Sequence, residues 1–331
     1  MSHRTLRRIR RIAAAAVVGG LLAGCGTTVE DGAGGGGSTT RGTAGTEVTA
    51  EPIEAARKIT DGRGVTVATE AVPKRIVCLV ALCDDILTEL GITPAATNSR
   101  LLAHEKFLGP AKAGKVPVVP GGFLNPEVEA ILGYEPDLVI GLEDTHGKLA
   151  PALKDATVFW PVQPAKWQDS VGYLRNLAAL TGRTDAGERA EETFRKKLAA
   201  AEAAPSERTA LVMFGSDENF GVATPGTDVT AGILPGIADY PWKSRGIEGT
   251  YSLEEILARN VEVLFVETLS FGGPAKKGER LSDRLAGNPL WSKIPAVRKG
   301  RVIEVDPEVW AKGRGTRSLG VVLDEATAAL R

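Results

Sequence analysis

Two stretches of the chain carry the same order of apolar residues, and this internal repeat restricts the possible folds most. "EAILGYEPDLVIGLE" begins at Glu129 and "EEILARNVEVLFVET" begins at Glu254. In their alignment Ile131 meets Ile256, and a run typical of a β-strand follows at the same offset in both. Coincidence is the alternative, because a helix followed by a strand is common in α/β proteins. We interpret the pattern as a structural repeat, so that the chain contains two related halves.

Short apolar runs alternate with amphipathic segments through both halves. Runs with the length of buried strands are "PKRIVCLV", "VPVV", "DLVIGL", "ATVFW", "RTALVMF", "VEVLFVE" and "GRVIEVD". Segments with helical patterns or helix-end signals are "DDILTELG", "NPEVEAILGYE", "KLAPALKD", "YSLEEILARN" and "TRSLGVVLDEATAALR". Turn residues in "RKITDGRGVTVA" predict a small hairpin before the first of these strands. The alternation predicts the α/β fold class, with two α/β lobes built on mainly parallel sheets.

The middle of the chain differs from both halves. An amphipathic segment, "WQDSVGYLRNLAALTG", precedes a stretch rich in Ala, Glu and Lys that ends at Pro205. As a single helix, Asp185 to Ala204 would extend about 30 Å. The expected organisation is a signal peptide at 1–24, a flexible tether at 25–57, an N-terminal lobe at 58–168, a connecting helical segment at 169–205 and a C-terminal lobe at 206–331.

The N-terminus has the composition of an export signal. "MSHRTLRRIRR" contains five arginines and no acidic residue, and the apolar run after it is shorter than the roughly 20 residues that a spanning helix needs. The run ends at Leu22-Ala23-Gly24-Cys25, which resembles the lipobox of bacterial lipoproteins, whose cysteine carries the lipid. A glycine- and threonine-rich stretch follows and is too polar to fold. We expect Cys25 to anchor the protein at the extracytoplasmic face of the cell membrane; a simple signal peptide with a chance cysteine is the alternative.

The charge balance excludes several classes of partner. Lys and Arg number 40 and Asp and Glu number 41, and loss of the signal's five arginines changes the net charge from −1 to about −6. No basic face is implied, so nucleic acid is not an expected partner. After Cys25 only Cys78 and Cys83 remain. A turn between them would allow a disulfide, whereas two buried free thiols are the alternative.

Several motifs together resemble one family. "KITDGRGVTV", "DDILTELGITP", "NPEVEAILGYEPDLVIG", "YSLEEILARNVEVLFVET" and "NPLWSKIPAVRKGRVIEVD" are similar, in this order, to bacterial ABC-transporter solute-binding lipoproteins for ferric siderophores and cobalamin. The resemblance covers residues 58–330. It implies two α/β lobes joined by a single long helix, a ligand cleft between them, a membrane permease as partner, and no enzymatic activity. It also implies a monomer without a cofactor of its own, since iron would be carried as a siderophore complex.

The resemblance further implies one permease-docking glutamate on each lobe. The motifs place them at Glu129 and Glu254, with Glu127 and Glu255 as the alternatives. Two exposed carboxylates on related lobes could orient the protein on a symmetric partner, because charge complementarity fixes orientation. The alternative is that both are ordinary acidic residues in the first turn of a helix.

The expected ligand site lies in loops beyond the carboxyl ends of the strands. "WAKGRGTRS" offers Trp310, Arg314 and Arg317, and arginine forks suit the oxygen atoms of an iron chelate. A packing role for the tryptophan and solvated arginines are the alternatives. Weaker candidates are Arg100, Phe123 and Trp242. A relative that binds hydroxamate siderophores carries an arginine where this chain has Phe123, which leaves the chelating chemistry open.

Other functions fit the sequence less well. Import of a free metal ion would need several His and carboxylate ligands, and besides His3 in the signal only His104 and His146 are present. The G-x-S-x-G motif of many hydrolases is absent. Cobalamin or haem as the ligand, and a lipoprotein that senses or sequesters its ligand without a transporter, remain alternatives to siderophore import.

Overall fold

The computed structural model describes residues 48–216, 219–245, 250–269 and 279–331. The chain separates into two units, 1–46 and 47–331, and the second contains all of the elements below. The expected signal peptide, Cys25 and most of the expected tether lie outside the described residues. No helix in the described part of the chain is long and apolar enough to cross a membrane.

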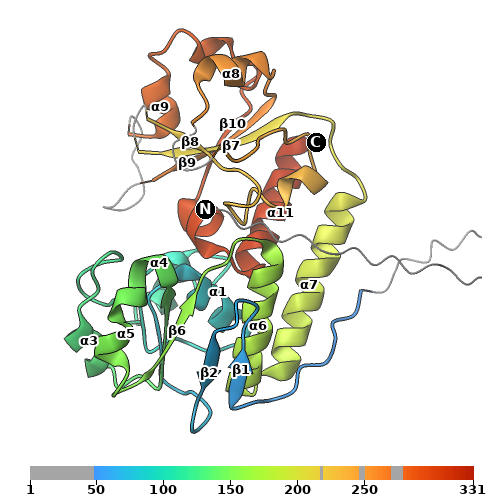
Figure 1. Cartoon of the computed structure of the whole chain (residues 1–331). Coiled ribbons are helices and arrows are strands. Elements are labelled where there is room, and N and C mark those ends of the chain that lie inside the picture. Colours follow the sequence, from blue (N-terminus) through green and yellow to red (C-terminus); the bar gives the residue numbers. More distant parts are fainter. Residues whose placement is uncertain (1–47, 217–218, 246–249, 270–278) are drawn as a thin grey trace, which may run out of the picture. The chain divides into compact units, whose positions relative to one another are not determined.

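The N-terminal lobe is built on a four-stranded, wholly parallel sheet in the order β4-β3-β5-β6 (Figure 1). Its strands are β3 Ile76–Cys78, β4 Ala96–Thr97, β5 Leu138–Leu142 and β6 Val158–Val162. Its helical segments are α1 Ala81–Glu89, η1 Leu101–Ala103, α2 Pro110–Ala113, α3 Val128–Gly133, α4 Glu143–His146, η2 Gly147–Leu149 and α5 Ala150–Leu153. The expected hairpin is confirmed as the antiparallel pair β1 Lys58–Thr60 and β2 Thr66–Ala68.

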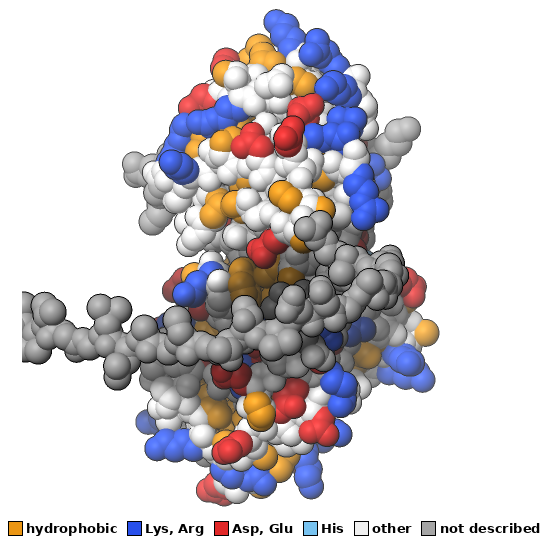
Figure 2. Space-filling model, turned by 90° about the vertical axis from the view of Figure 1, so that its right-hand side faces the viewer, with side chains coloured by type: hydrophobic (Ala, Val, Ile, Leu, Met, Phe, Trp, Pro, Cys, Tyr) orange, Lys and Arg blue, Asp and Glu red, His pale blue; other side chains and the backbone are white. Residues whose placement is uncertain are grey.

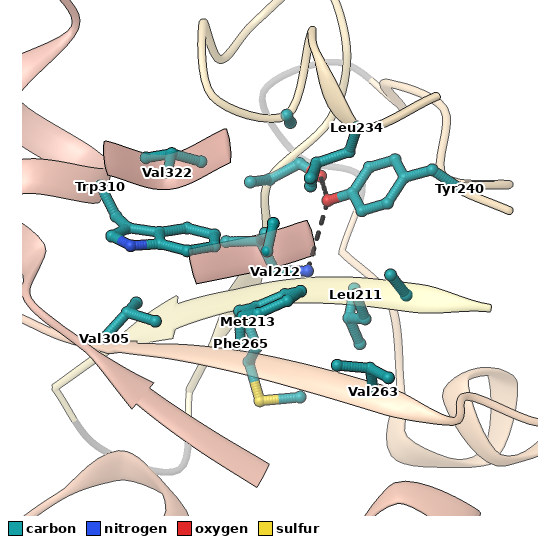
Figure 3. Close-up of a cluster of buried hydrophobic side chains, with 14 of the residues drawn as sticks. Leu211, Val212, Met213, Leu234, Tyr240, Val263, Phe265, Val305, Trp310 and Val322 are labelled. Carbon is teal, nitrogen blue, oxygen red and sulfur yellow. Dashed lines mark hydrogen bonds between the residues drawn. The ribbon is translucent and has the colours of Figure 1, made fainter. Parts of the chain in front are cut away.

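The C-terminal lobe has a four-stranded sheet in the order β10-β9-β7-β8. Its strands are β7 Ala210–Gly215, β8 Gly221–Val222, β9 Val263–Thr268 and β10 Val302–Val305, of which only β8 is antiparallel to its neighbour. Its helical segments are η3 Leu234–Gly236, α8 Leu253–Ala258, α9 Leu281–Leu285, η4 Trp291–Lys293 and α10 Pro295–Arg298. Figure 3 shows the apolar side chains that pack against this sheet.

The two lobes repeat one supersecondary unit, which confirms the interpretation of the sequence. Helices α3 and α8 are each six residues long, and the residues that follow them, Glu135 and Asn260, both have positive φ, 48° and 55°. The next strands, β5 and β9, begin at the same distance from their helices and pair in parallel with β3 and β7. Ile131 and Ile256, which the alignment matched, are both fully buried.

One long helix joins the lobes, as the sequence predicts. It is α7 Thr184–Glu202, which packs against both α6 Trp167–Thr181 and α11 Thr316–Leu330 (Figure 1). A further contact between the lobes follows β10. Beyond β10 the chain forms a π-helical turn, η5 Glu308–Gly313, that contacts α1 of the N-terminal lobe, and α11 starts beside it.

Two details of the N-terminal lobe differ from the sequence-based expectation or extend it. "VPVV" is not a strand, since Val118 forms only an isolated bridge with Thr97, and the sheet edge is instead the two-residue strand β4. Cys78 and Cys83, whose pairing the sequence left open, form a disulfide with their Cα atoms 5.4 Å apart. The start of α1 at Ala81 supplies the turn that brings them together.

Candidate ligand-binding site

Contacts between loops bring the carboxyl ends of the two sheets together. The backbone N–H of Arg100, just after β4, donates to Oε2 of Glu308 in η5 over 3.2 Å. The hydroxyl of Ser170 at the start of α6 donates to the backbone oxygen of Arg314 over 2.6 Å. Since ligands of open α/β sheets bind beyond the carboxyl ends of the strands, the segment around η5 is where a ligand would meet both lobes.

Arg314 is held in an unusual backbone conformation at the end of η5. Its φ is +58°, a left-handed conformation that side chains other than glycine rarely adopt. The glycines on both sides leave no room for adjustment: a Cβ atom at Gly313 would overlap Ser318, and one at Gly315 would overlap Asp85. Such strain clusters at functional sites, so this geometry marks Arg314 as a candidate.

The side chain of Arg314 lies near two carboxyl groups without forming an ion pair. Its Nε donates to the backbone oxygen of Ala311 over 3.0 Å, and no described carboxylate lies within ion-pair distance of its guanidinium. Burial raises the pKa of Asp228, and it raises the pKa of Glu267 well above its usual range, while the charge of Arg314 opposes both shifts. Burial disfavours the anionic forms of both acids, so they do not fully neutralise the guanidinium. Arg314 can therefore bind an anionic ligand.

In the N-terminal lobe, Arg100 and Phe123 lie close to the end of β4. Arg100 is exposed, and its guanidinium has no hydrogen bond or ion pair with the described residues. Phe123 is 41 % exposed in the loop after the bridge at Val118, and Asn98 ties this loop to β4 by donating to Gly122 O over 2.9 Å. An exposed aromatic ring and an arginine without a partner among the described residues, both in loops near the end of β4, fit the composition of a ligand site.

A buried histidine holds the loop of Phe123 in place. The backbone N–H of Leu142 donates to Nδ1 of His146 over 3.0 Å, so Nε2 carries the proton and donates to Phe123 O over 2.7 Å. Burial lowers the pKa of His146, which keeps the ring neutral. The Phe123 and His146 rings also pack edge to face, with centroids 5.1 Å apart. Nothing in the sequence pattern around His146 indicates this structural role.

The two tryptophans among the expected site residues are buried. Trp310 is 0 % exposed and stacks on Phe265 with ring centroids 4.8 Å apart (Figure 3). Trp242 is 1 % exposed and donates to Ala210 O over 2.7 Å. The expectation that "WAKGRGTRS" is a loop is wrong, because the segment consists of the end of η5, the two residues after it and the start of α11. Trp310 packs directly behind Arg314, whereas Trp242 lies at the amino end of β7, opposite the end of the sheet that meets η5, so the structure does not bring Trp242 to the site.

Arg317 has partners within the protein. It donates to Glu89 over 3.0 Å and to the backbone oxygen of Lys106 over 2.6 Å, and its guanidinium lies 5.7 Å from the Phe107 ring. It lines a hollow of about 430 Å³ between α1, α7 and α11 that also contains Arg189. The structure therefore places the expected trio of Trp310, Arg314 and Arg317 in three different environments.

Two adjacent buried aspartates connect α1 to its surroundings. Asp85 accepts from the backbone N–H groups of Arg317 (3.1 Å) and Ser318 (2.8 Å) at the start of α11, and so ties that helix to the N-terminal lobe. Asp84 accepts from the hydroxyls of Thr97 (2.6 Å) and Ser99 (2.5 Å). Burial raises the pKa of both aspartates to about 7.

The acidic residues expected to dock a permease occupy matching places. Glu129 and Glu254 are each the second residue of their helix, α3 or α8, and both are exposed without a hydrogen bond or ion pair to the described residues. Glu255 is engaged instead: it completes a capping box with Ser252 and pairs with Arg245 over 2.7 Å. The geometry favours Glu254 over Glu255 as a free contact.

Charges of both signs are interspersed on the face drawn in Figure 2, as the near-neutral composition predicts. Nothing in the described ranges forms a group of three or more His, Cys, Asp or Glu side chains that could hold a metal ion.

A model of the periplasmic binding protein family matches residues 76–309, which span both sheets and reach the start of η5. The chain belongs to this family. Its members are binding proteins, and the two related lobes with sheets ending at η5 are consistent with that role.

Two curated relatives and one solved structure extend the comparison of this periplasmic binding protein. The Fe(3+)-citrate-binding protein YfmC of Bacillus subtilis is 25% identical over 79% of this chain and 82% of its own. The probable siderophore-binding lipoprotein YfiY of the same species is 26% identical over 81% and 86%. FeuA of Bacillus subtilis, solved with ferri-bacillibactin, superposes with a TM-score of 0.65 at 18% identity over 83% and 98%. This last likeness confirms the fold of two α/β lobes.

Proposed function

We propose that this protein is the extracytoplasmic solute-binding component of an ABC importer, and that it binds an iron(III)–siderophore and delivers it to the membrane permease. The observation that carries the proposal is Arg314: its backbone is strained where the two lobes meet, and its guanidinium forms no ion pair with the described residues. The names of YfmC and YfiY support an iron chelate as the class of ligand. The proposed activity is binding and delivery, without catalysis.

The proposed ligand contacts come from both lobes. Arg100 and Arg314 would bind anionic oxygens of the chelate, because arginine forms charge-assisted hydrogen bonds with oxygen acceptors in a fixed fork. The exposed ring of Phe123 would cover apolar parts of the ligand. Trp310 supports the site from within the lobe, where it stacks on Phe265. A direct ligand contact of Arg317 stays a prediction.

The partner at the membrane is proposed to be a permease contacted by both lobes. Glu129 and Glu254 are exposed, unpaired and in equivalent positions of a structural repeat. That arrangement suits two equivalent basic pockets on a symmetric partner, since opposite charges at matched places fix orientation. In this proposal the protein is a monomer, and a lipid on Cys25 holds it at the outer face of the cell membrane.

A fluorescence titration of the purified mature protein tests the ligand class. Ferric complexes absorb where tryptophan emits, so a bound ferric siderophore is expected to quench the emission of the five tryptophans in a saturable manner. The panel contains ferric citrate, ferri-bacillibactin and a ferric trihydroxamate, each with its iron-free form, together with cobalamin and haem. Saturable quenching by cobalamin or haem alone would refute the siderophore proposal.

A further inference from the structure

We infer that Glu267 is an additional ligand-contacting residue, and that its neutral carboxyl group donates a hydrogen bond to the same anionic oxygen cluster that Arg314 binds. This inference rests on the proposed function and names the charge class of the ligand: an iron chelate that presents anionic oxygens, and no ammonium group, to the C-terminal lobe.

The position of Glu267 in the sheet places it beside η5. It is the second-last residue of β9, at the carboxyl end of the strand. Side chains alternate along a strand, so Glu267 lies on the same face as Phe265, whose ring stacks with Trp310 of η5. The chain then reaches Arg314 four residues after Trp310. The face that carries Glu267 is therefore the face that η5 covers.

The carboxyl group of Glu267 is buried and incompletely satisfied. The residue is 2 % exposed, and its Oε1 has no hydrogen-bond partner among the described residues. A buried polar atom without a partner costs about 1–3 kcal/mol. Native structures rarely keep such an atom without a role, and a ligand oxygen that accepts from Glu267 would supply the missing partner.

The groups that face Glu267 determine its charge. They are Asp228, which follows β8, Arg314, and the phenol of Tyr240, which accepts from the backbone N–H of Val212 over 3.3 Å and donates to Ala223 O over 2.7 Å. Burial and the negative charge of Asp228 both raise the pKa of Glu267, whereas Arg314 lowers it without forming an ion pair. Asp228 is stabilised by the backbone N–H of Ala231, over 2.7 Å. Glu267 is consequently the member of the pair that keeps the proton.

A neutral Glu267 beside Arg314 selects the ligand by charge. The guanidinium can only donate, and a protonated carboxyl can donate as well, so two donors converge on one place. Carboxylate or catecholate oxygens of a ferric chelate satisfy both. An ammonium group would be repelled by Arg314 and would require Glu267 to ionise in a buried place.

The test compares the pH dependence of binding in wild type and in Glu267→Gln, with ferric citrate and ferri-bacillibactin as probes. In wild type the Kd is expected to rise, by up to about tenfold per pH unit, once the pH exceeds the pKa of Glu267. In Glu267→Gln this rise is expected to disappear, because the amide keeps a donor at every pH. Glu262→Gln is the matched control: Glu262 lies just before β9 and pairs with Lys299 at the surface, so its profile should follow wild type.

A second measurement does not depend on any variant. Calorimetric titration of wild type in two buffers with different ionisation enthalpies gives the number of protons exchanged on binding. The account predicts proton uptake that increases as the pH rises through the pKa of Glu267, after the exchange of the free chelate is subtracted.

The outcomes separate the inference from the proposed function. Tight binding with the same pH profile in wild type and Glu267→Gln would overturn the inference and leave the function standing. So would tight binding without proton uptake at the pH values at which the Kd of wild type rises. Binding that strengthens with pH and is lost in Glu267→Gln would overturn it too, since the ligand would then be cationic at this place. If neither probe nor any other ferric siderophore binds, the proposed function and the inference both fail.

Discussion

Replacement of Arg314 by glycine separates the ligand-binding role of its side chain from its backbone conformation. The φ of +58° costs an L-residue roughly 1–2 kcal/mol, which glycine avoids. Two losses of stability oppose this gain. The greater freedom of glycine in the unfolded chain costs about 0.5–1 kcal/mol, and the lost hydrogen bond to Ala311 O costs about 0.5–1.5 kcal/mol. We expect the free energy of unfolding to change by less than about 2 kcal/mol.

The effect on ligand binding is expected to be much larger. A charge-assisted hydrogen bond contributes about 1.5–3 kcal/mol, so Arg314→Gly should raise the Kd of the ferric siderophore about 10- to 150-fold. Urea unfolding gives the stability and fluorescence quenching gives the Kd. An unchanged Kd would refute Arg314 as a ligand contact, and a stability loss above about 3 kcal/mol would show that its role is structural.

Arg317→Ala is the matched comparison from the same segment. It removes the partner of Glu89 and the hydrogen bond to Lys106 O. We expect it to lower the free energy of unfolding by roughly 1–2 kcal/mol, a value that already allows for solvent screening of this partly exposed pair. If Arg317 contacts the ligand, the Kd rises as well; if its partners are only those in the structure, the Kd stays within about twofold.

Three further predictions concern stability, docking and anchoring. Folding raises the pKa of Asp84 from 3.8 to about 7, so its proton-linked stabilisation is fully present below pH 3.8 and is lost as the pH rises through 7. Asp84→Asn should therefore flatten the fall of the unfolding free energy over this pH range. An unchanged slope would contradict the burial argument. Glu129→Lys or Glu254→Lys should reduce uptake of the ligand and leave the affinity for it intact. Glu255→Lys should chiefly lower stability, because it breaks the capping box. Uptake by Glu129→Lys and Glu254→Lys that equals wild type would contradict the docking assignment. Cys25→Ala should release the protein from the membrane fraction, and its firm retention there would argue against a lipid anchor.

Much of the architecture could be predicted because it follows from local patterns. The apolar runs of β5, β7 and β9 are long enough to show their type. The repeat appears in the sequence because both lobes need the same helix, left-handed residue and buried strand. Strand β4 could not be predicted, since two residues carry no periodicity. The π-helical turn η5 could not be predicted either, because packing against α1, and not the glycine-rich composition of the segment, determines its conformation.

The site could be predicted only in part. Arg314 was found from its arginine-rich segment, but its neighbours Asp228 and Glu267 come from segments far away along the chain. A signal for Glu267 was present: a strand of a parallel sheet that is buried on both faces is expected to be apolar throughout, and this acid interrupts "VLFVET". The same holds for Asp84 and Asp85, which are buried in α1 although their sequence suggests an exposed first turn.

The central claim, delivery of a ferric siderophore to a permease, is tested most directly by uptake of radioactive iron. Cells that lack this chain are supplied with the ferric siderophore that binds best in the fluorescence panel, and the chain is restored as wild type or as Glu129→Lys/Glu254→Lys. The account predicts that wild type restores uptake, and that the double variant binds the siderophore with wild-type affinity but restores little uptake. Uptake that is the same with and without the chain would contradict it.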